Sequence, residues 1–244
     1  RRSELIQVAP GILDKNIQSL AKELNLDQID TDIFSLLLRY QLHEPINELF
    51  NSLTRGSHMG VTGIFANCLN IDSSKISARL SSKSKLLSSG ALIPMNRGGK
   101  DIDDLVQVPD AIMNAMRKST ASMEDVRPYI IGDPAQANLC WSDYDHLGQA
   151  RDKLAAFLTE AIQKKLTGVN IMIWGPAGTA TTEFCKTLAE KIGVNLYTLA
   201  EADEEGDEPN RKDRIGLYRL SQNLLRYQNN SLLLFDEMDD LFEN

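Results

Sequence analysis

The sequence lacks the features that mark several classes of protein. Its three cysteines, Cys68, Cys140 and Cys185, stand far apart and form no metal-binding spacing, and so few cysteines are typical of a reducing compartment. The three histidines are isolated as well. No apolar run approaches the ~18 residues that a membrane span requires, and we find no signal peptide. These absences predict a cytoplasmic protein that has no membrane partner.

An excess of positive charge is also missing. The net charge is −8, so the chain as a whole is not a polyanion binder, although one local basic face remains compatible with that total. Hydrophobic residues make up 42% and charged residues 25%, which is typical of a globular chain rather than a disordered one. The 244 residues suffice for two modest domains. The chain begins without methionine and ends directly after an apolar strand pattern, from which we expect a piece of a longer protein.

The first part of the chain, residues 1–118, is predicted to be a mainly helical domain. Helix-forming residues dominate Leu20 to Leu53, and Pro45 is expected to end or kink the first helix there. Asp72 is a predicted N-cap of the third helix, and a strand, a Gly-Gly turn and a second strand follow it. Three helices followed by a hairpin are the outline of a winged helix. We expect its core to contain Leu36, Leu37, Leu49, Phe65 and Leu80.

The third of these helices is rich in basic residues. Two interpretations fit Lys75, Arg79, Lys83 and Lys85, with Arg97 and Lys100 in the wing. They could contact DNA as a recognition helix and a basic wing, or they could form the solvated face of a protein-docking or oligomerisation domain. Because the chain is acidic overall, we favour docking and keep DNA as the alternative.

A change of pattern follows residues 119–148, which have weak periodicity and are predicted to be a linker. From residue 149 onwards, amphipathic helices alternate with short apolar strands, among them "VNIMIW", "VNLYTLA" and "SLLLFDE". This alternation predicts an α/β domain over residues 149–244, with a parallel sheet between layers of helices. We expect Ile171, Ile173, Leu233 and Phe235 to lie in the interior of that sheet.

The loop "GPAGTATT" follows the first of these strands and precedes a helix. A tight glycine-containing turn at this place points backbone N–H groups inward, and the helix adds the positive end of its dipole, so the loop can bind phosphate groups. In such loops a lysine bridges the outer phosphates and a Ser/Thr hydroxyl binds Mg²⁺. Here Thr182 occupies the hydroxyl position, whereas Ala180 replaces a glycine and Thr181 replaces the lysine. The predicted nucleotide-binding residues are Gly175, Pro176, Ala177, Gly178, Thr179, Ala180, Thr181 and Thr182.

The stretch "LLLFDE" supplies the second half of this predicted site. Four apolar residues deliver Asp236 and Glu237 to the carboxyl end of a buried strand, which is the edge where ligands bind in open α/β sheets. Asp236, together with Thr182, is the predicted Mg²⁺ ligand. Glu237 is the predicted catalytic residue, because a second carboxylate can orient or deprotonate the attacking water.

Together these residues give a resemblance to a known family. From about Asp143 to the end, the chain resembles the first half of an AAA+ ATPase core, a P-loop NTPase fold, with a degenerate Walker A motif and an intact Walker B motif. The segment "SDYDHL" at 142–147 is similar to the one that helps to form the adenine pocket in that family. The resemblance implies binding of ATP or ADP with Mg²⁺, a ring of identical subunits, and ATP hydrolysis coupled to remodelling of a macromolecule such as a protein substrate. Taken whole, the chain resembles bacterial AAA proteins that carry a helical or winged region ahead of the core.

The departures from the family pattern leave three functions open. Because of Ala180 and Thr181, and because no sensor strand, arginine finger or helical lid follows, the chain as written is expected to hydrolyse ATP poorly. The first function is an ATPase that remodels a partner. The second is a scaffold that binds no nucleotide or does not hydrolyse it, and the third is a DNA-binding winged-helix module attached to an ATPase. Lys186 lies a helical turn beyond the loop and is expected to face solvent instead of replacing the lysine.

Overall fold

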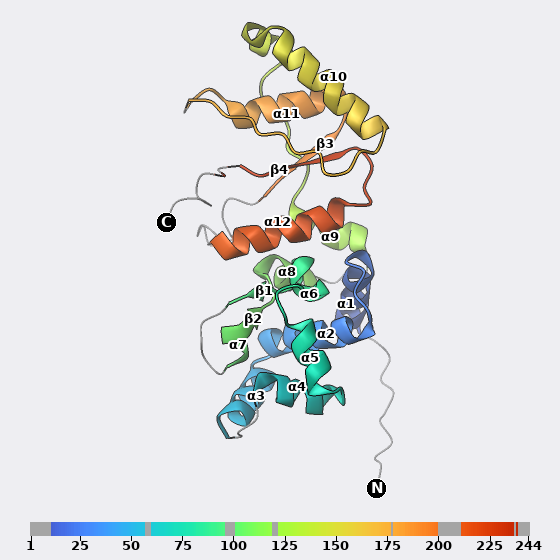
Figure 1. The fold of residues 1–244 in the computed structure, drawn as a ribbon, viewed down its shortest axis with the longest axis vertical. Coiled ribbons are helices and arrows are strands. Elements are labelled where there is room, and N and C mark those ends of the chain that lie inside the picture. The colour runs from blue at the N-terminus through green and yellow to red at the C-terminus, as the bar shows by residue number, and fades with distance from the viewer. Residues whose placement is uncertain are drawn as a thin grey trace.

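The fold was analysed in a computed structural model, which describes residues 11–56, 60–95, 101–118, 122–176, 178–199, 211–236 and 238. Figure 1 shows a helical N-terminal part below a smaller α/β part, with helix α12 between the two. The elements of the N-terminal part are α1 (Ile12–Glu23), α2 (Gln28–Leu42), α3 (Glu44–Gly56), α4 (Val61–Leu69), α5 (Ser73–Arg79), α6 (Lys85–Ser88), β1 (Ile93–Pro94), α7 (Ile102–Leu105), β2 (Val106–Gln107), α8 (Asp110–Met116) and α9 (Met123–Ile131). Those of the α/β part are the 3₁₀ helix η1 (Trp141–Leu147), α10 (Gln149–Gln163), α11 (Thr181–Ile192), β3 (Asn195–Thr198), α12 (Arg211–Leu225) and β4 (Ser231–Leu234).

Local signals in the sequence set several helix boundaries. Asp72 is the N-cap of α5, as predicted, and its carboxylate accepts a hydrogen bond from the Ser74 N–H at 2.8 Å. Helix α2 ends at Leu42, and Pro45 lies in the first turn of α3, where its missing N–H costs nothing. Side-chain caps and proline therefore act here as the sequence indicates.

The core of the N-terminal part is aromatic and aliphatic. Tyr40, Phe50 and Phe65 meet edge to face, with ring centroids 5.9 and 6.0 Å apart. Of the predicted core residues, Leu37 and Phe65 are buried, and Leu36 and Leu80 are partly buried against the same cluster. Leu49 was predicted wrongly, since its side chain is 56% exposed. Its neighbour Phe50 occupies the inner face of α3, and adjacent residues of a helix point in different directions.

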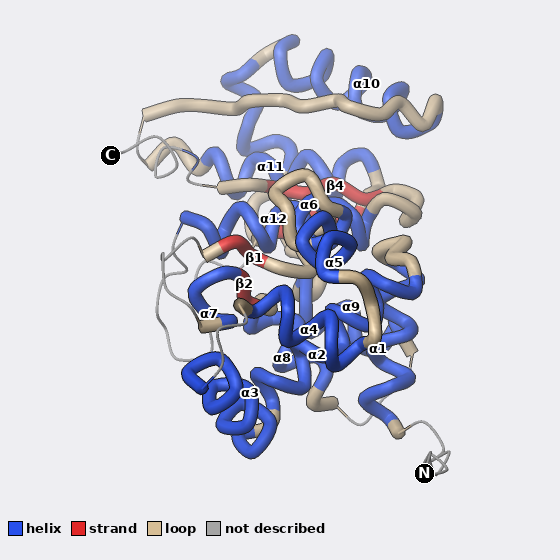
Figure 2. The backbone as a smooth tube through the Cα atoms, turned by 60° about the horizontal axis from the view of Figure 1, so that its bottom comes forward, coloured by secondary structure: helices blue, strands red, loops and turns tan. Residues whose placement is uncertain are grey.

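The two strands predicted on either side of the Gly-Gly turn form a short antiparallel pair. Strand β1 pairs with β2, with Ile93 opposite Gln107 and Pro94 opposite Val106. The tube in Figure 2 shows these two strands beside the helices of the N-terminal part. The Gly-Gly turn, with Arg97 and Lys100, lies outside the described residues. Helices α1 to α6 precede this pair and α7 lies between its two strands, so the described elements are more numerous than the predicted three helices and hairpin, and a winged helix stays a prediction.

The α/β part contains a parallel pair of strands with helices on both sides. Strand β3 runs parallel to β4, in a register from Asn195 opposite Ser231 to Thr198 opposite Leu234. Leu232 packs with the α10–α11 cluster, whereas Leu233 packs with the cluster that contains α12. The pair therefore forms the middle of three layers, as Figure 1 also shows. A wider sheet of the P-loop type stays a prediction.

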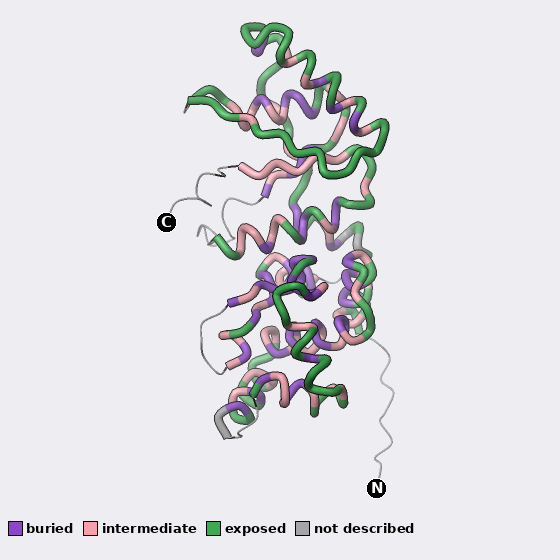
Figure 3. Tube along the Cα trace, viewed as in Figure 1, coloured by how far each residue is buried: buried purple, intermediate pink, exposed green. Residues whose placement is uncertain are grey.

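One predicted strand does not form. Residues 171–174 are extended but lie in no strand of the described part of the chain. Ile173 packs with the α10–α11 cluster, whereas Ile171, Met172 and Trp174 are 39, 80 and 84% exposed. Figure 3 shows that the run that connects α10 to α11 along the chain is mostly exposed. The assignment of 171–174 as a buried strand, with Ile171 inside, was wrong, because an apolar run predicts a strand without supplying its hydrogen-bonding partner.

The segment 119–148, predicted as a linker, has structure of its own where it is described. It contains α9 and η1, and Val126 and Ile130 of α9 are buried in the core of the N-terminal part. Further along, the Ala135 N–H donates to the Leu196 carbonyl of β3 at 2.7 Å. The segment thus joins the two parts by packing against both, which weak periodicity did not indicate.

Candidate functional site

The loop between the extended segment and α11 has the conformation of a tight turn. The hydroxyl and the N–H of Thr179 both donate to the Pro176 carbonyl, at 2.8 and 3.2 Å. A β-carbon on Gly175 would lie 2.7 Å from the Thr179 hydroxyl oxygen, so only glycine fits there without a shift. Gly178 has φ +83°, in the region that favours glycine. Ala177 lies outside the described residues. Both glycines that the sequence retains are therefore needed by this turn.

Ala180 adopts a conformation that also favours glycine. Its φ and ψ are +55° and +43°, the left-handed region, and it is the N-cap of α11. This conformation costs a residue with a β-carbon about 1–2 kcal/mol. The P-loop pattern has glycine at this position, and the left-handed conformation of Ala180 is one that glycine adopts more readily. Since Ala180 has no side-chain acceptor, it cannot cap the first N–H groups of α11.

The structure brings the two halves of the predicted site together. The hydroxyl of Thr182, in the first turn of α11, donates to the Asp236 carboxylate Oδ2 at 2.6 Å. Asp236 lies just beyond the carboxyl end of β4, at the edge where ligands bind in parallel sheets. Glu237 lies outside the described residues, so only its place next to Asp236 in the sequence bears on its role.

The pair of Thr182 and Asp236 suits a magnesium ion better than a transition metal. Mg²⁺ takes hard oxygen ligands, keeps several waters, and binds through one or two protein groups plus the phosphates of its substrate. A hydroxyl 2.6 Å from a carboxylate supplies such a partial set. Within the described ranges, no group of three or more His, Cys, Asp or Glu residues could hold a metal by itself. The residues present therefore fit a metal that arrives with a nucleotide.

The segment "SDYDHL" packs directly against the loop. Tyr144 of η1 is 4% exposed, and its hydroxyl donates to the Ala180 carbonyl at 3.4 Å. The centre of its ring lies 5.0 Å from that of Phe184, edge to face, and Trp141 stacks on the Phe184 ring with the centroids 6.1 Å apart. Burial raises the pKa of Tyr144, and the charge of Glu183 acts in the same direction. This segment therefore supports the loop, next to the place where the resemblance puts the adenine pocket.

Helix α11 contains two further groups that bear on the site. Burial, with a smaller contribution from the charge of Asp236, raises the pKa of the Cys185 thiol to about 11. Lys186 lies 3.4 Å from Glu183, and its side chain is 24% exposed, so it pairs on its own helix instead of facing solvent. The Asn138 backbone N–H donates to Glu183, and this bond, with the charge of Lys186, holds the pKa of Glu183 below its ordinary value. Lys186 is therefore paired away from the loop.

Sequence reasoning missed Arg214. This residue, in the first turn of α12, donates to the Asp236 carbonyl at 2.6 Å, and its guanidinium lies 5.1 Å from the centre of the Phe235 ring. Nothing in "RKDRIG" distinguishes one basic residue from its neighbours, since the contact depends on where α12 crosses the end of β4.

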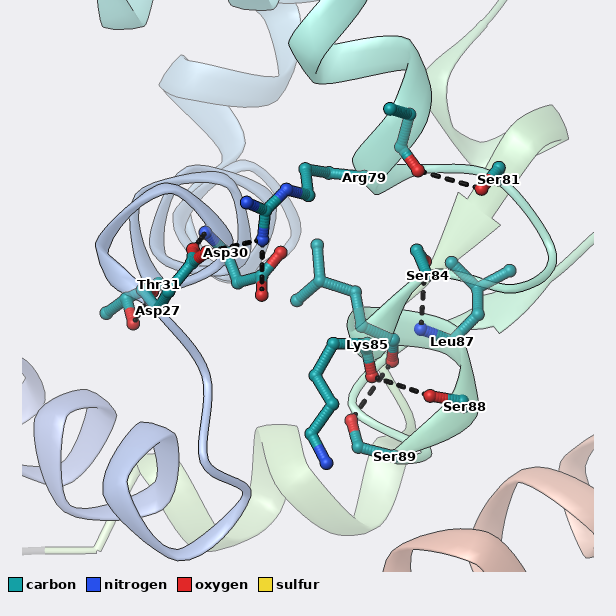
Figure 4. A network of polar contacts seen from close by, with 12 residues as sticks. Asp27, Asp30, Thr31, Arg79, Ser81, Ser84, Lys85, Leu87, Ser88 and Ser89 are labelled. Atoms are coloured by element: carbon teal, nitrogen blue, oxygen red, sulfur yellow. Dashed lines mark hydrogen bonds and ion pairs between the residues drawn. The ribbon is translucent and has the colours of Figure 1, made fainter.

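The basic residues of the N-terminal part are not all available for a partner. Arg79 of α5 reaches Asp27 at 2.6 Å and Asp30 at 2.9 Å, and Asp30 is 2% exposed. Figure 4 shows the Arg79 guanidinium directed at both carboxylates. Arg79 is thus an internal anchor between α5 and α2. Lys75, on the same helix, is exposed.

A hollow in the N-terminal part lies away from these residues. It has a volume of about 280 Å³ and is lined by residues of α1 and of the C-terminal ends of α2 and α8 and the residues that follow them, among them Ile12, Leu42, His43 and Met116. No predicted site residue lines it.

Comparisons of the chain with models of protein families, with curated proteins and with solved structures give no match. The described helices include none that is long and apolar enough to cross a membrane. Any functional conclusion therefore rests on the geometry of this chain and on the resemblance of its motifs.

Proposed function

We propose that this chain contains a nucleotide site of the AAA+ type, in which the cradle for Mg²⁺ and phosphate is kept but the cation for the outer phosphates is missing. The hydrogen bond between Thr182 and Asp236 is the observation that carries this proposal. It joins the end of a parallel strand to the first turn of the helix that follows a glycine-containing turn. Phosphate sites of P-loop proteins are built on this juxtaposition.

Each part of the site has a role in this proposal. The backbone from Gly175 to Thr181 and the first turn of α11 bind phosphate oxygens. Thr182 and Asp236 hold Mg²⁺, which would neutralise charge on the phosphates. Glu237, by its place in the sequence, orients the attacking water. Thr181 cannot supply the positive charge of a lysine, and hydrogen bonds to charged groups are worth about 1.5–3 kcal/mol. Affinity for ATP is therefore expected to be roughly ten- to a few hundred-fold lower than in a complete site.

Function at the level of the whole protein follows from the resemblance. A ring of identical subunits, remodelling of a protein substrate and a cytoplasmic location belong to this proposal. The alternative is a scaffold that binds no nucleotide, and the two departures at Ala180 and Thr181 favour it. A DNA-binding role for the winged part is the weaker alternative, because Arg79 is held by Asp27 and Asp30.

Calorimetric titration with Mg²⁺·ATP tests the proposal. The unaltered chain should bind weakly, and the double variant Ala180→Gly with Thr181→Lys should bind at least tenfold more tightly. Adding Asp236→Ala to the double variant should remove the contribution of Mg²⁺, and Asp152→Ala, an exposed carboxylate of α10, is the matched control. Tight binding by the unaltered chain would contradict the missing-cation argument. No gain in the double variant would leave the scaffold as the function.

A further inference from the structure

Helix α12 lies between the N-terminal part and the β3–β4 pair (Figure 1). Its buried Leu220 and Leu224 are both 0% exposed and belong to the core of the N-terminal part. Its first turn reaches the end of β4 through Arg214. One helix therefore contacts both the N-terminal core and the backbone of Asp236 at the candidate site.

The contact with the N-terminal part is a close approach between backbones. A β-carbon on Gly90, which has φ +79°, would lie 2.5 Å from the Gly216 carbonyl oxygen and from the Leu220 nitrogen. A β-carbon on Gly216 would lie 2.7 Å from Cγ1 of Ile93 in β1. No side chain separates the two backbones at Gly90. Because this contact is tightly packed, a shift of the segment that precedes β1 should also displace α12.

A polar contact strengthens this attachment at the N-terminal end of α12. The Lys212 ammonium donates to the Met95 carbonyl at 2.7 Å, directly after β1. Lys212 lies two residues from Arg214. The end of α12 that faces the candidate site is therefore also held by the N-terminal part.

On the side that faces β4, α12 contacts the backbone of Asp236, the proposed Mg²⁺ ligand. Arg214 donates to the Asp236 carbonyl at 2.6 Å, and its guanidinium covers the Phe235 ring. Tyr218, one turn further along α12, meets the same ring edge to face at 5.3 Å. Arg214 and Tyr218 thus hold residues 235 and 236 from one side, while Thr182 holds the Asp236 carboxylate from the other.

We propose that Arg214 is a positioning residue for Asp236, and that α12 couples the docking of the N-terminal part to the position of this carboxylate. The inference rests on the proposed function, which makes Asp236 a ligand of Mg²⁺. A metal or phosphate site needs its ligands held within ~0.5 Å of the productive geometry. A displacement of α12 from β1 would therefore weaken Mg²⁺ binding through Arg214, without touching the loop.

The first test measures binding in the double variant Ala180→Gly with Thr181→Lys. Adding Arg214→Gln should lower the affinity for Mg²⁺·ATP roughly tenfold and leave the affinity for ATP in EDTA unchanged. Arg214→Lys should recover part of the loss, because lysine keeps the positive charge and carries its donors on a longer stem than glutamine. Arg219→Gln, the same change at an exposed position of α12, should have no effect. An equal loss with and without Mg²⁺ would overturn the positioning role.

The second test needs no nucleotide, so it separates a failure of this inference from a failure of the proposed function. Gly216→Ala should push α12 away from Ile93, and hydrogen exchange of residues 231–236 should become roughly tenfold faster. Ile93→Ala, which removes the atom that the new β-carbon would meet, should restore slow exchange in the combined variant. Exchange in 231–236 that does not respond to Gly216→Ala would overturn the coupling. Exchange that rises equally in α2 would also overturn it, because the effect would then be global.

Discussion

The Thr182 hydroxyl donates to the Asp236 carboxylate across 2.6 Å, although the two residues are 54 positions apart in the chain. Since both are partly buried, this bond also contributes to stability. Valine has nearly the same shape as threonine but lacks the hydroxyl, so Thr182→Val should lower the free energy of unfolding by about 1 kcal/mol. This is less than the full value of a hydrogen bond to a charged group, because water still reaches the pair.

Urea denaturation of the Thr182 variants checks this expectation. Thr182→Ser keeps the hydroxyl and should stay close to the unaltered chain. If the valine variant is as stable as the unaltered chain and only the serine variant loses stability, the methyl group and not the hydrogen bond is responsible.

Ala180→Gly is expected to stabilise the folded chain. Its left-handed backbone costs alanine about 1–2 kcal/mol, and the greater backbone freedom of unfolded glycine offsets about 0.5–1 kcal/mol of the gain. The free energy of unfolding should therefore rise by about 0.5–1 kcal/mol. Ala156→Gly, at an exposed helical position of α10, should instead lower it by about 1 kcal/mol. Thermal or urea unfolding of the two variants should shift in opposite directions.

Cys185 is expected to react slowly with alkylating reagents. Because its pKa is raised to about 11, its thiolate is scarce at pH 8, whereas Cys68 and Cys140 are exposed. Iodoacetamide should modify Cys185 roughly a hundredfold more slowly than a cysteine with the ordinary pKa, because so little of Cys185 is thiolate at that pH. The stability that the neutral thiol contributes should be present below its unfolded pKa and lost as the pH rises through about 11. Mass spectrometry of the modified peptides measures the rates, and equal rates in the native protein would contradict the burial.

Arg79→Met should destabilise the N-terminal part. It leaves Asp30, which is 2% exposed, without its cation. Removing one partner of a fully buried pair costs about 3–5 kcal/mol, and we expect about 2 kcal/mol here because Arg79 and Asp27 still contact water. Lys75→Met on the same helix is the control and should change stability by less than about 0.5 kcal/mol.

The same ion pairs predict a pH dependence. Burial favours the neutral acid of Asp27, but the Asp30 N–H and the Arg79 guanidinium outweigh it and hold the pKa of Asp27 below its ordinary value. A depressed pKa contributes stability above the unfolded value, near 3.8, which is lost as the pH falls through the folded one. The difference in urea midpoint between the unaltered chain and Arg79→Met should therefore shrink from pH 7 to pH 3. A difference that stays constant would show that packing of the arginine stem, not its charge, holds α5.

Short-range patterns predicted much of the local structure and the chemical content of the candidate site. The cap at Asp72, the break before Pro45, the strand before Asp236 and the helix after the glycine turn all follow from the preferences of neighbouring residues. The need for a glycine-like backbone at Ala180 was expected from the motif, and its φ of +55° agrees. Such features depend on a few consecutive residues, so the order of the chain is enough to specify them.

Long-range packing decided what the sequence could not indicate. Periodicity placed Leu49 in the core, but Phe50 occupies that face of α3, and an apolar run at 171–174 formed no strand because pairing needs a partner from elsewhere in the chain. Arg79 is basic in the sequence but paired within the fold, since the carboxylates of Asp27 and Asp30, at the start of α2, lie within reach of it. The approach of Gly90 to Gly216 and the contact of Arg214 with Asp236 likewise join segments that are distant in the chain. Residue order alone does not indicate these contacts, because each depends on which surfaces exclude water together once the whole chain has folded.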